Sequence, residues 1–191
     1  MTILARLTEK SWEPGAQPVE RDRPSAGAVG MVAYFGVAMV MFSLLLAAYL
    51  MRMGLHAGTE HVHDWKPMPD PPPLWINTLV LAASSVAWEV ARRERAVRAA
   101  IVGSALGVLF LGGQLLLWRH YQGAGYTLSS NPANAFFYLL TALHGLHIIG
   151  GLFAAGRALA AANMRNVVLC ALYWHFLLIV WLVLAALLLS T

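Results

Sequence analysis

The chain has 191 residues, of which 59% are hydrophobic and only 12% carry a charge, whereas charged residues make up about 25% of an average soluble domain. This composition excludes an ordinary soluble protein and predicts an all-α integral membrane protein, because each bilayer-crossing helix needs about 20 mostly apolar residues. The formal net charge is +4, but the arginines lie at the ends of apolar segments rather than on one continuous basic face, so we expect no nucleic-acid partner.

Residues 1–26 are polar, contain several prolines and lack the apolar core of a secretory signal, so we expect a flexible cytoplasmic tail. The first predicted span follows at about 27–53. The next loop, GLHAGTEHVHDWKPMPDPPP, contains five prolines and should lack regular structure. Its candidates for a divalent-cation site are Glu60, His61, His63 and Asp64. A water-exposed loop without metal is the simpler interpretation.

Four further apolar segments complete a single transmembrane domain of five helices, residues 27–191. They are predicted at about 74–91, 99–121, 133–156 and 167–189. Three aromatic residues near the predicted ends, Trp75, Trp118 and Tyr121, are of the kind that favours the headgroup layer. The single cysteine, Cys170, lies in the last span and has no partner for a disulfide or a thiolate metal site.

Lysine and arginine are distributed unequally between the two sides of these spans, with ten on one side and three on the other. The ten are Arg6, Lys10, Arg21, Arg23, Arg92, Arg93, Arg95, Arg98, Arg157 and Arg165, and the three are Arg52, Lys66 and Arg119. Because cytoplasmic loops carry the excess of positive charge, we predict a cytoplasmic N-terminus and a C-terminus on the opposite side of the membrane.

Polar and ionisable side chains within the predicted spans are costly without a partner, and five of them are candidates for a functional role. They are Glu89, Gln114, His144, His147 and His175. His147 and His175 each lie ten residues from an arginine at the same boundary, which places both about 15 Å deep and able to face each other. Two opposed imidazoles are candidates for haem or metal ligands. We favour interhelical hydrogen bonding, because few other ligands converge on them.

Small and polar residues in the fourth span recur at helical spacing and predict a face on which another helix can lie closely. They are Thr141, His144, Gly145, Ile148, Gly151 and Ala155. Gly103 and Gly107 form a GxxxG pair with the same expected role in the third span. Glu89 and Arg93 have the spacing of a helical ion pair, which we favour over proton transfer. Gln114 is expected to bond across to a neighbouring helix.

Four segments resemble subunit III of the haem-copper terminal oxidases, and together they cover the last four spans. Residues 136–152, FFYLLTALHGLHIIGGL, resemble the family signature FFxxTGxHGxHVxxG, and residues 173–184, YWHFLLIVWLVL, resemble its YWHFVDVVWL ending. Residues 74–86, LWINTLVLAASSV, and 106–118, LGVLFLGGQLLLW, are similar to two further helices of that family. The first span matches less distinctly.

The resemblance implies the five-helix bacterial form of an accessory, non-redox subunit that contacts subunit I directly, with subunit II and small subunits as further partners. It therefore also implies a bacterial inner membrane, in which the C-terminus would be periplasmic. The complex would reduce oxygen and translocate protons, with haem and copper in the partner subunits and no catalytic, cofactor-binding or metal-binding residue in this chain. Such relatives stabilise the complex and hold phospholipid. The residues expected to have structural, lipid-binding or interface roles are His144, His147, His175, Gln114, Glu89, Arg93 and Trp174.

Three intramembrane positions that are acidic in many relatives are apolar here, namely Ala38, Leu117 and Leu178. A proton-collecting role through those acids is therefore unsupported, whereas a packing role is unaffected. The alternatives are a subunit-III-like protein of a nitric oxide reductase system and a membrane cytochrome that uses His147 and His175. Because electrons would enter through other chains, this sequence does not distinguish cytochrome c from quinol as the donor. An ion-coupled transporter is disfavoured by the scarcity of intramembrane carboxylates.

Overall fold

The computed structural model describes residues 25–58, 72–161 and 164–189. These residues form five α-helices, which we label α2 to α6. Their bounds are α2 Ala26–Gly58, α3 Pro72–Glu94, α4 Val97–Gly123, α5 Pro132–Ala160 and α6 Met164–Leu189. All five are long and apolar enough to cross a membrane, so the predicted all-α membrane bundle is confirmed. Each helix contains its predicted span and continues slightly beyond it. Most of the predicted tail and the His61 and His63 loop lie outside the described residues.

Local backbone conformation and side-chain capping mark two of the helix ends. Between α3 and α4 the chain turns at Arg95, which has a φ of 53°. At the start of α5, the side chain of Asn131 accepts a hydrogen bond of 2.9 Å from the amide of Ala133, and Pro132 occupies the first turn, where a missing N–H is tolerated. Asn131 thus caps one of the backbone N–H groups that the first turn of α5 leaves without an intrahelical partner.

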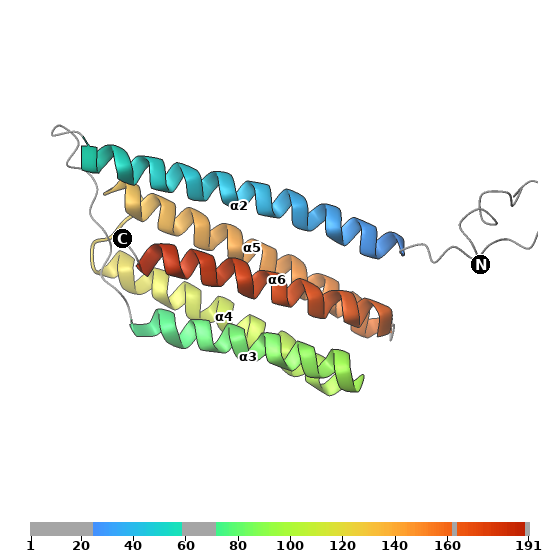
Figure 1. Cartoon of the computed structure of the whole chain (residues 1–191). Coiled ribbons are helices and arrows are strands. Elements are labelled where there is room, and N and C mark those ends of the chain that lie inside the picture. The colour runs from blue at the N-terminus through green and yellow to red at the C-terminus, as the bar shows by residue number, and fades with distance from the viewer. Residues whose placement is uncertain (1–24, 59–71, 162–163, 190–191) are drawn as a thin grey trace, which may run out of the picture.

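Helix α2 lies at one edge of the bundle and α3 with α4 at the opposite edge, with α5 and α6 between them (Figure 1). In its most apolar stretch α2 is only 11% buried, compared with 50% for α6. The contact face of α2 alternates three- and four-residue steps through Phe35, Ala38, Phe42, Leu45 and Tyr49, which is the spacing of a left-handed helix pair. A single narrow stripe therefore attaches α2.

Aromatic rings make up most of that attachment. Phe35 stacks on Phe176 of α6 with 4.3 Å between ring centroids. Phe42 lies 5.3 Å from the ring of His147, and Tyr49 meets Phe136 edge-on at 5.5 Å, both on α5. Since lipid chains are as apolar as these side chains, the shape of such contacts rather than the hydrophobic effect holds the helix.

The predicted stripe of small and polar residues on α5 is buried along its whole length, as is the Gly103 and Gly107 pair of α4. A Cβ on Gly103 would lie 2.6 Å from Cδ1 of Trp88, and one on Gly107 would lie 3.0 Å from Cζ2 of Trp174. Glycine is needed at Gly103 because the ring of Trp88 occupies the space where a Cβ would be. The prediction of close helix packing is confirmed for both segments.

Of the aromatic residues predicted for the headgroup layer, only Trp75 is largely exposed, at 59%. Tyr121 is buried, with its ring 5.4 Å from that of Phe137, and the indole of Trp118 donates to the hydroxyl of Thr141 at 3.1 Å. The prediction was wrong for Tyr121 because closeness to a helix end does not determine which way a side chain faces.

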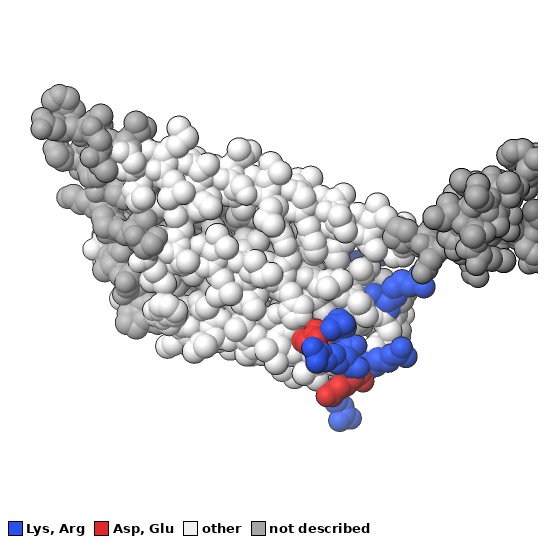
Figure 2. Space-filling model, in the orientation of Figure 1, with Lys and Arg blue, Asp and Glu red and all other residues white. Residues whose placement is uncertain are grey.

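Charged side chains on the described residues gather at one end of the bundle, where α3 ends and α4 begins (Figure 2). We call this the arginine-rich end; its arginines are Arg92, Arg93, Arg95, Arg98, Arg157 and Arg165. The opposite end carries Arg52 near the end of α2 and Arg119 near the end of α4. By the positive-inside rule the arginine-rich end is predicted to face the cytoplasm.

Gly151→Ala tests the close packing on α5. A Cβ there would lie 2.6 Å from Cε1 of Tyr173 and 3.1 Å from Cζ3 of Trp174, so we expect the free energy of unfolding to fall by about 1–3 kcal/mol, as in an overpacked core. The matched control is Gly150→Ala, where nothing lies within 4 Å. Unfolding of the purified chain in mixed detergent micelles measures both variants, and equal stabilities would contradict the close approach of α5 and α6.

Candidate functional site

Trp174 of α6 lies where four helices meet, and its side chain is fully buried. Its ring fits into slots left by Gly107 of α4 and Gly151 of α5 and lies 5.0 Å from the ring of Trp88 on α3. The indole N–H donates to Oγ of Ser84 on α3 at 2.6 Å. One side chain thus fixes the separation of α3, α4, α5 and α6.

The serine that receives this bond also joins α3 to α4. Oγ of Ser84 donates to the backbone carbonyl of Gly103 at 2.6 Å. Further along the same interface, the indole of Trp181 donates to Oγ1 of Thr78 at 2.9 Å. Because α3 and α6 are antiparallel, Trp174 with Ser84 and Trp181 with Thr78 form two successive rungs along their contact. Hydroxyl groups that would be costly in hydrocarbon are thereby satisfied between helices.

His175 makes a third link between α6 and α3. Its Nδ1 lies 2.6 Å from Oγ of Ser85, and its Nε2 lies 3.1 Å from a carboxylate oxygen of Glu89. The carboxylate can only accept, so Nε2 carries a proton, and in the neutral ring Nδ1 accepts from the serine hydroxyl. The side chains of His175 and Glu89 are 36% and 21% exposed, so this link is partly accessible on the outside of the bundle.

Glu89 also binds two arginines. The predicted pair with Arg93 is present, and Arg92 donates through Nε and Nη2 at 2.8 and 2.6 Å. The sequence analysis missed Arg92, although its three-residue separation from Glu89 is also a helical contact distance. The carboxylate therefore binds two arginines, whose charge it offsets only by half, and it accepts the imidazole N–H of His175. This cluster of four residues holds the end of α3 to α6.

Sequence distance from the arginines at the boundary places His175 deeper than Glu89. Counting from the helix ends, His175 is 11 residues into α6, or about 16 Å, while Glu89 is five residues from the end of α3, or about 8 Å. The two side chains nevertheless bond, so α6 begins farther out than α3 ends. When neighbouring helices are staggered, the number of residues from the end of each helix does not give the relative depth of two residues on different helices.

His147 and His175 contact different helices, so the structure does not bring them together as an axial pair. The ring of His147 lies against Phe42 and Tyr34 of α2, at 5.3 and 6.0 Å between centroids, and its Nδ1 bonds the carbonyl of Leu143 at 2.7 Å. Both ring nitrogens of His175 are bonded to α3. The prediction that the two imidazoles face each other fails, because equal depth does not fix the rotation of either helix.

His147 and Tyr173 together hold α2 near the arginine-rich end. The hydroxyl of Tyr173 on α6 donates to the backbone carbonyl of His147 at 2.8 Å. The same hydroxyl lies 3.1 Å from the hydroxyl of Tyr34. A tyrosine hydroxyl has one proton and can accept as well, so Tyr34 donates and Tyr173 relays the link to α5.

His144 is fully buried between aromatic rings, with Phe110 of α4 edge-on at 5.9 Å and Trp181 of α6 at 5.1 Å. Neither ring nitrogen has a hydrogen-bond partner within the described part of the chain. The expected interhelical hydrogen bond from His144 is therefore replaced by ring packing. Gln114 does cross to a neighbour as predicted, since its Oε1 accepts from Nδ2 of Asn77 at 3.2 Å.

No group of three or more histidine, cysteine, aspartate or glutamate side chains among the described residues could hold a metal ion. Three apolar residues singled out in the sequence, Ala38, Leu117 and Leu178, occupy packing positions in this chain. Ala38 and Leu117 are buried, and Leu178 packs against the main core. Several polar groups of this arrangement, including those of Trp174, Trp181, His175 and Gln114, bond across helix interfaces.

Comparison with known proteins identifies relatives of this chain. A family model described as cytochrome c oxidase subunit III matches residues 27–189, which includes almost all of the five helices. Cytochrome c oxidase subunit 3 of Thermostichus vulcanus is 31% identical over 87% of this chain and 88% of its own length. A probable cytochrome c oxidase subunit 3 of Nocardia farcinica is 28% identical over 92% and 95%. Cytochrome bo(3) ubiquinol oxidase subunit 3 of Pseudomonas aeruginosa is 26% identical over 80% and 78%.

Trp174→Phe and Ser84→Ala test the central hydrogen bond. Phenylalanine keeps an aromatic ring in the slot but removes the N–H, so we expect the two substitutions to be coupled by about 0.6–2 kcal/mol, the range for hydrogen bonds between membrane helices. A double-mutant cycle on the free energy of unfolding in mixed micelles measures the coupling. Strictly additive effects would mean that the bond contributes nothing.

Glu89→Gln tests the cluster formed by Glu89, Arg92, Arg93 and His175. The amide removes the negative charge that binds Arg92, Arg93 and His175, so we expect a lower melting temperature, with the difference from the parent protein shrinking at high salt. The matched control is Glu94→Gln on the same helix end, where the side chain is exposed. Equal melting temperatures for the two variants at low salt would contradict a stabilising cluster.

Proposed function

The chain belongs to the cytochrome c oxidase subunit III family, and we propose that it is the accessory, non-redox subunit III of a bacterial haem-copper oxidase, stabilising subunit I and holding phospholipid. It is a multi-pass bacterial membrane protein, and membership of the family implies membership of an oxidase complex. In that complex, oxygen reduction and proton translocation belong to chains that carry haem and copper. This chain contributes a helical scaffold and an outer surface for partner subunits and lipid.

The proposal rests on one observation: several buried or half-buried polar side chains form hydrogen bonds to other helices of the same bundle. Trp174, Trp181 and His175 bond to α3, and Gln114 bonds to Asn77. A redox protein would need side-chain ligands aimed at a shared cofactor, and an ion carrier would need polar groups along a path. Side chains that bond helix to helix favour a scaffold.

The outer surface supports an assembly role. Large apolar side chains face outward on every helix, and α2 is the most exposed of the five. Lipid tails and apolar partner helices satisfy such surfaces equally well. We propose that subunit I covers part of this surface, that subunit II and small subunits belong to the same complex, and that phospholipids cover the remainder.

The named relatives include a subunit of a cytochrome c oxidase and a subunit of a ubiquinol oxidase. The bonded contacts described above lie inside the bundle and use no residue that would distinguish one electron donor from the other. We therefore place donor recognition in the partner chains, and propose that this subunit serves the complex in the same way with either donor.

Purification through a tag on this chain tests the proposal. We expect a haem-containing oxidase to co-purify, and we expect deletion of the chain to shorten the lifetime of the enzyme during turnover while the visible haem spectrum of the remaining complex is retained. Restoring the chain from a plasmid is the control. Recovery of the chain without any haem-containing partner, or unchanged assembly, turnover and lifetime after deletion, would overturn the proposal.

A further inference from the structure

A groove of about 490 Å³ lies between the first turns of α3 and the later half of α4. Apolar side chains form most of its lining, among them Val80, Leu109 and Leu116. The two leucines are 57% and 66% exposed, so the groove opens on the outer surface of the bundle. Two polar side chains, Asn77 and Arg119, also line it. We call it the α3–α4 groove.

A glycine on α4 leaves the groove open. Four lining residues of α4 follow one another by three or four positions and therefore lie on one face of the helix. They are Leu109, Gly112, Leu116 and Arg119. A Cβ on Gly112 would have nothing within 4 Å, whereas one on Gly113 would meet the side chain of Asn77. The missing side chain at Gly112 thus leaves a hollow between two leucines.

One side chain that lines the groove combines burial with hydrogen-bonding capacity. Asn77 is 6% exposed, and its Nδ2 donates to Oε1 of Gln114 at 3.2 Å. An amide nitrogen carries two N–H groups, and this bond uses one of them. Asn77 makes no other side-chain hydrogen bond to a described residue. The second N–H can therefore be donated to an acceptor that occupies the groove.

Arg119 lies at the outer end of the groove, four residues from the end of α4. Its side chain is exposed, and no ion pair or hydrogen bond joins it to another described residue. None of the residues that line the groove is acidic. The groove therefore ends in a positive charge that its own lining does not neutralise.

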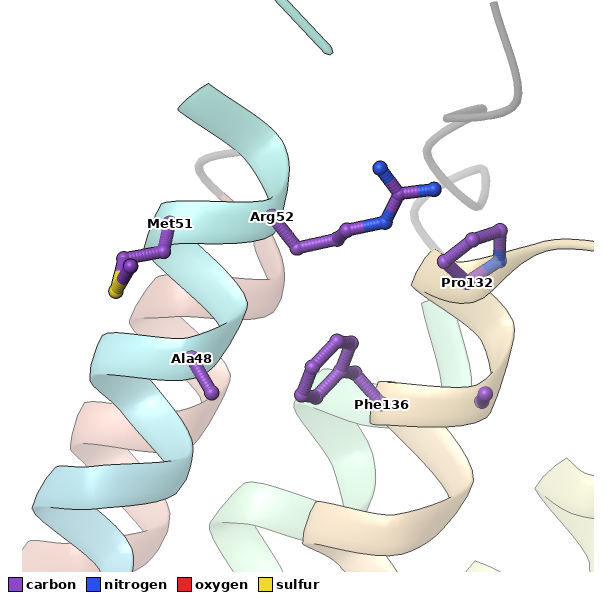
Figure 3. Close-up of a pocket in the computed structure, with 6 residues that line it drawn as sticks. Ala48, Met51, Arg52, Pro132 and Phe136 are labelled. Carbon is purple, nitrogen blue, oxygen red and sulfur yellow. The ribbon is translucent and has the colours of Figure 1, made fainter. Parts of the chain in front are cut away.

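A second hollow, of about 430 Å³ between the end of α2 and the start of α5, provides a contrast. Its arginine, Arg52, extends from α2 towards Pro132 (Figure 3). Arg52 already has an interaction within the chain, so its charge is not available to a ligand in the same way. Of these two hollows, only the α3–α4 groove contains an arginine without a partner among the described residues.

The length of the α3–α4 groove matches one leaflet of a bilayer. From Leu109 to Arg119 the helix advances by ten residues, or about 15 Å. The hydrocarbon core of a bilayer is about 30 Å thick, so each leaflet contributes about half of that. Trp75 in the first turn of α3 is 59% exposed at the same end, where an aromatic ring favours the headgroup layer. The groove thus runs from the headgroup layer towards the centre of the membrane.

We propose that the α3–α4 groove binds one phospholipid, with the phosphate at the guanidinium of Arg119 and an acyl chain over Gly112. The planar guanidinium can donate two parallel hydrogen bonds to phosphate oxygens, and the second N–H of Asn77 can be donated to an ester carbonyl. An anionic phospholipid is preferred over a zwitterionic one, because its headgroup brings no ammonium group near the arginine. The inference rests on the lipid-holding role proposed above and gives it a location.

A phospholipid fits this groove better than a transmembrane helix of a partner subunit. A helix that crosses the hydrocarbon core is about 30 Å long, which is twice the length of the groove. A partner helix would also cover Arg119 with apolar surface, which is costly unless the partner supplies an acid at that depth. A phospholipid supplies an apolar chain of one leaflet's length and a negative phosphate at its outer end.

The experiment uses the purified oxidase complex reconstituted with a small fraction of phosphatidylglycerol that carries a photoreactive diazirine near the start of one acyl chain. After irradiation, peptide mass spectrometry locates the labelled residues. We expect the label on the first turns of α3 and the later half of α4. Arg119→Gln should reduce this labelling about tenfold, the change expected when one charge-assisted contact is lost. Arg119→Lys keeps a cation and should reduce it less.

Three further variants fill the groove or serve as matched controls. Gly112→Trp fills the groove without changing the charge and should abolish the labelling. Gly150→Trp adds the same ring on α5, at another glycine with nothing within 4 Å, and should leave the labelling of α3 and α4 unchanged. Arg52→Gln removes an equal charge at the same end of the bundle and should also leave it unchanged. The melting temperature of each complex shows whether the variant is folded.

The inference is overturned if labelling of these segments does not exceed that of other lipid-facing residues, if Arg119→Gln and Arg52→Gln reduce it equally, or if a partner subunit cross-links to the groove instead. These outcomes are separable from failure of the proposed function. A chain that still co-purifies with the haem-containing oxidase but shows no local labelling refutes only the lipid site. A chain without an oxidase partner refutes the proposed function whatever its lipid contacts.

Discussion

The contact on which most of the bundle depends is the indole of Trp174, held between glycines and bonded to a serine. Gly107 and Gly151 leave room for the ring, Ser84 accepts its N–H, and the same serine donates to the backbone of Gly103. In a membrane, helices gain little from hiding apolar surface from lipid, so close fit and interhelical hydrogen bonds determine how they associate. The Trp174 contact provides both, and it does so for four helices at one point.

Helix α2 is attached by a different kind of contact. Its narrow stripe of aromatic rings reaches α5 and α6 but leaves most of its surface outside the bundle. Where the rings end at Tyr49, small side chains and Arg52 follow, and the helices no longer touch closely. The helix that packs least within the chain is thus the one best placed to hold lipid or a partner.

Hydropathy and small-residue spacing were sufficient to predict five membrane helices and the packing faces that carry Gly103, Gly107 and Gly151, because both signals are local to one helix. The partners of the histidines were not predictable in this way. His147 and His175 have equal sequence distances from the boundary, yet they face different helices, and the stagger between α3 and α6 brings Glu89 to His175. The rotation of a helix about its own axis and its shift along a neighbouring helix both depend on contacts with that neighbour. The sequence of one segment alone does not encode those contacts.

The account holds that the imidazoles of this chain fasten helices together, while haem and copper belong to partner subunits. The most direct test is to replace His175 by phenylalanine in the intact oxidase and to measure its haem content and its melting temperature on the same preparation. We predict an unchanged haem-to-protein ratio and visible spectrum with a lower melting temperature, because the links to Ser85 and Glu89 are lost. Loss of haem or a shifted spectrum at an unchanged melting temperature would contradict the account.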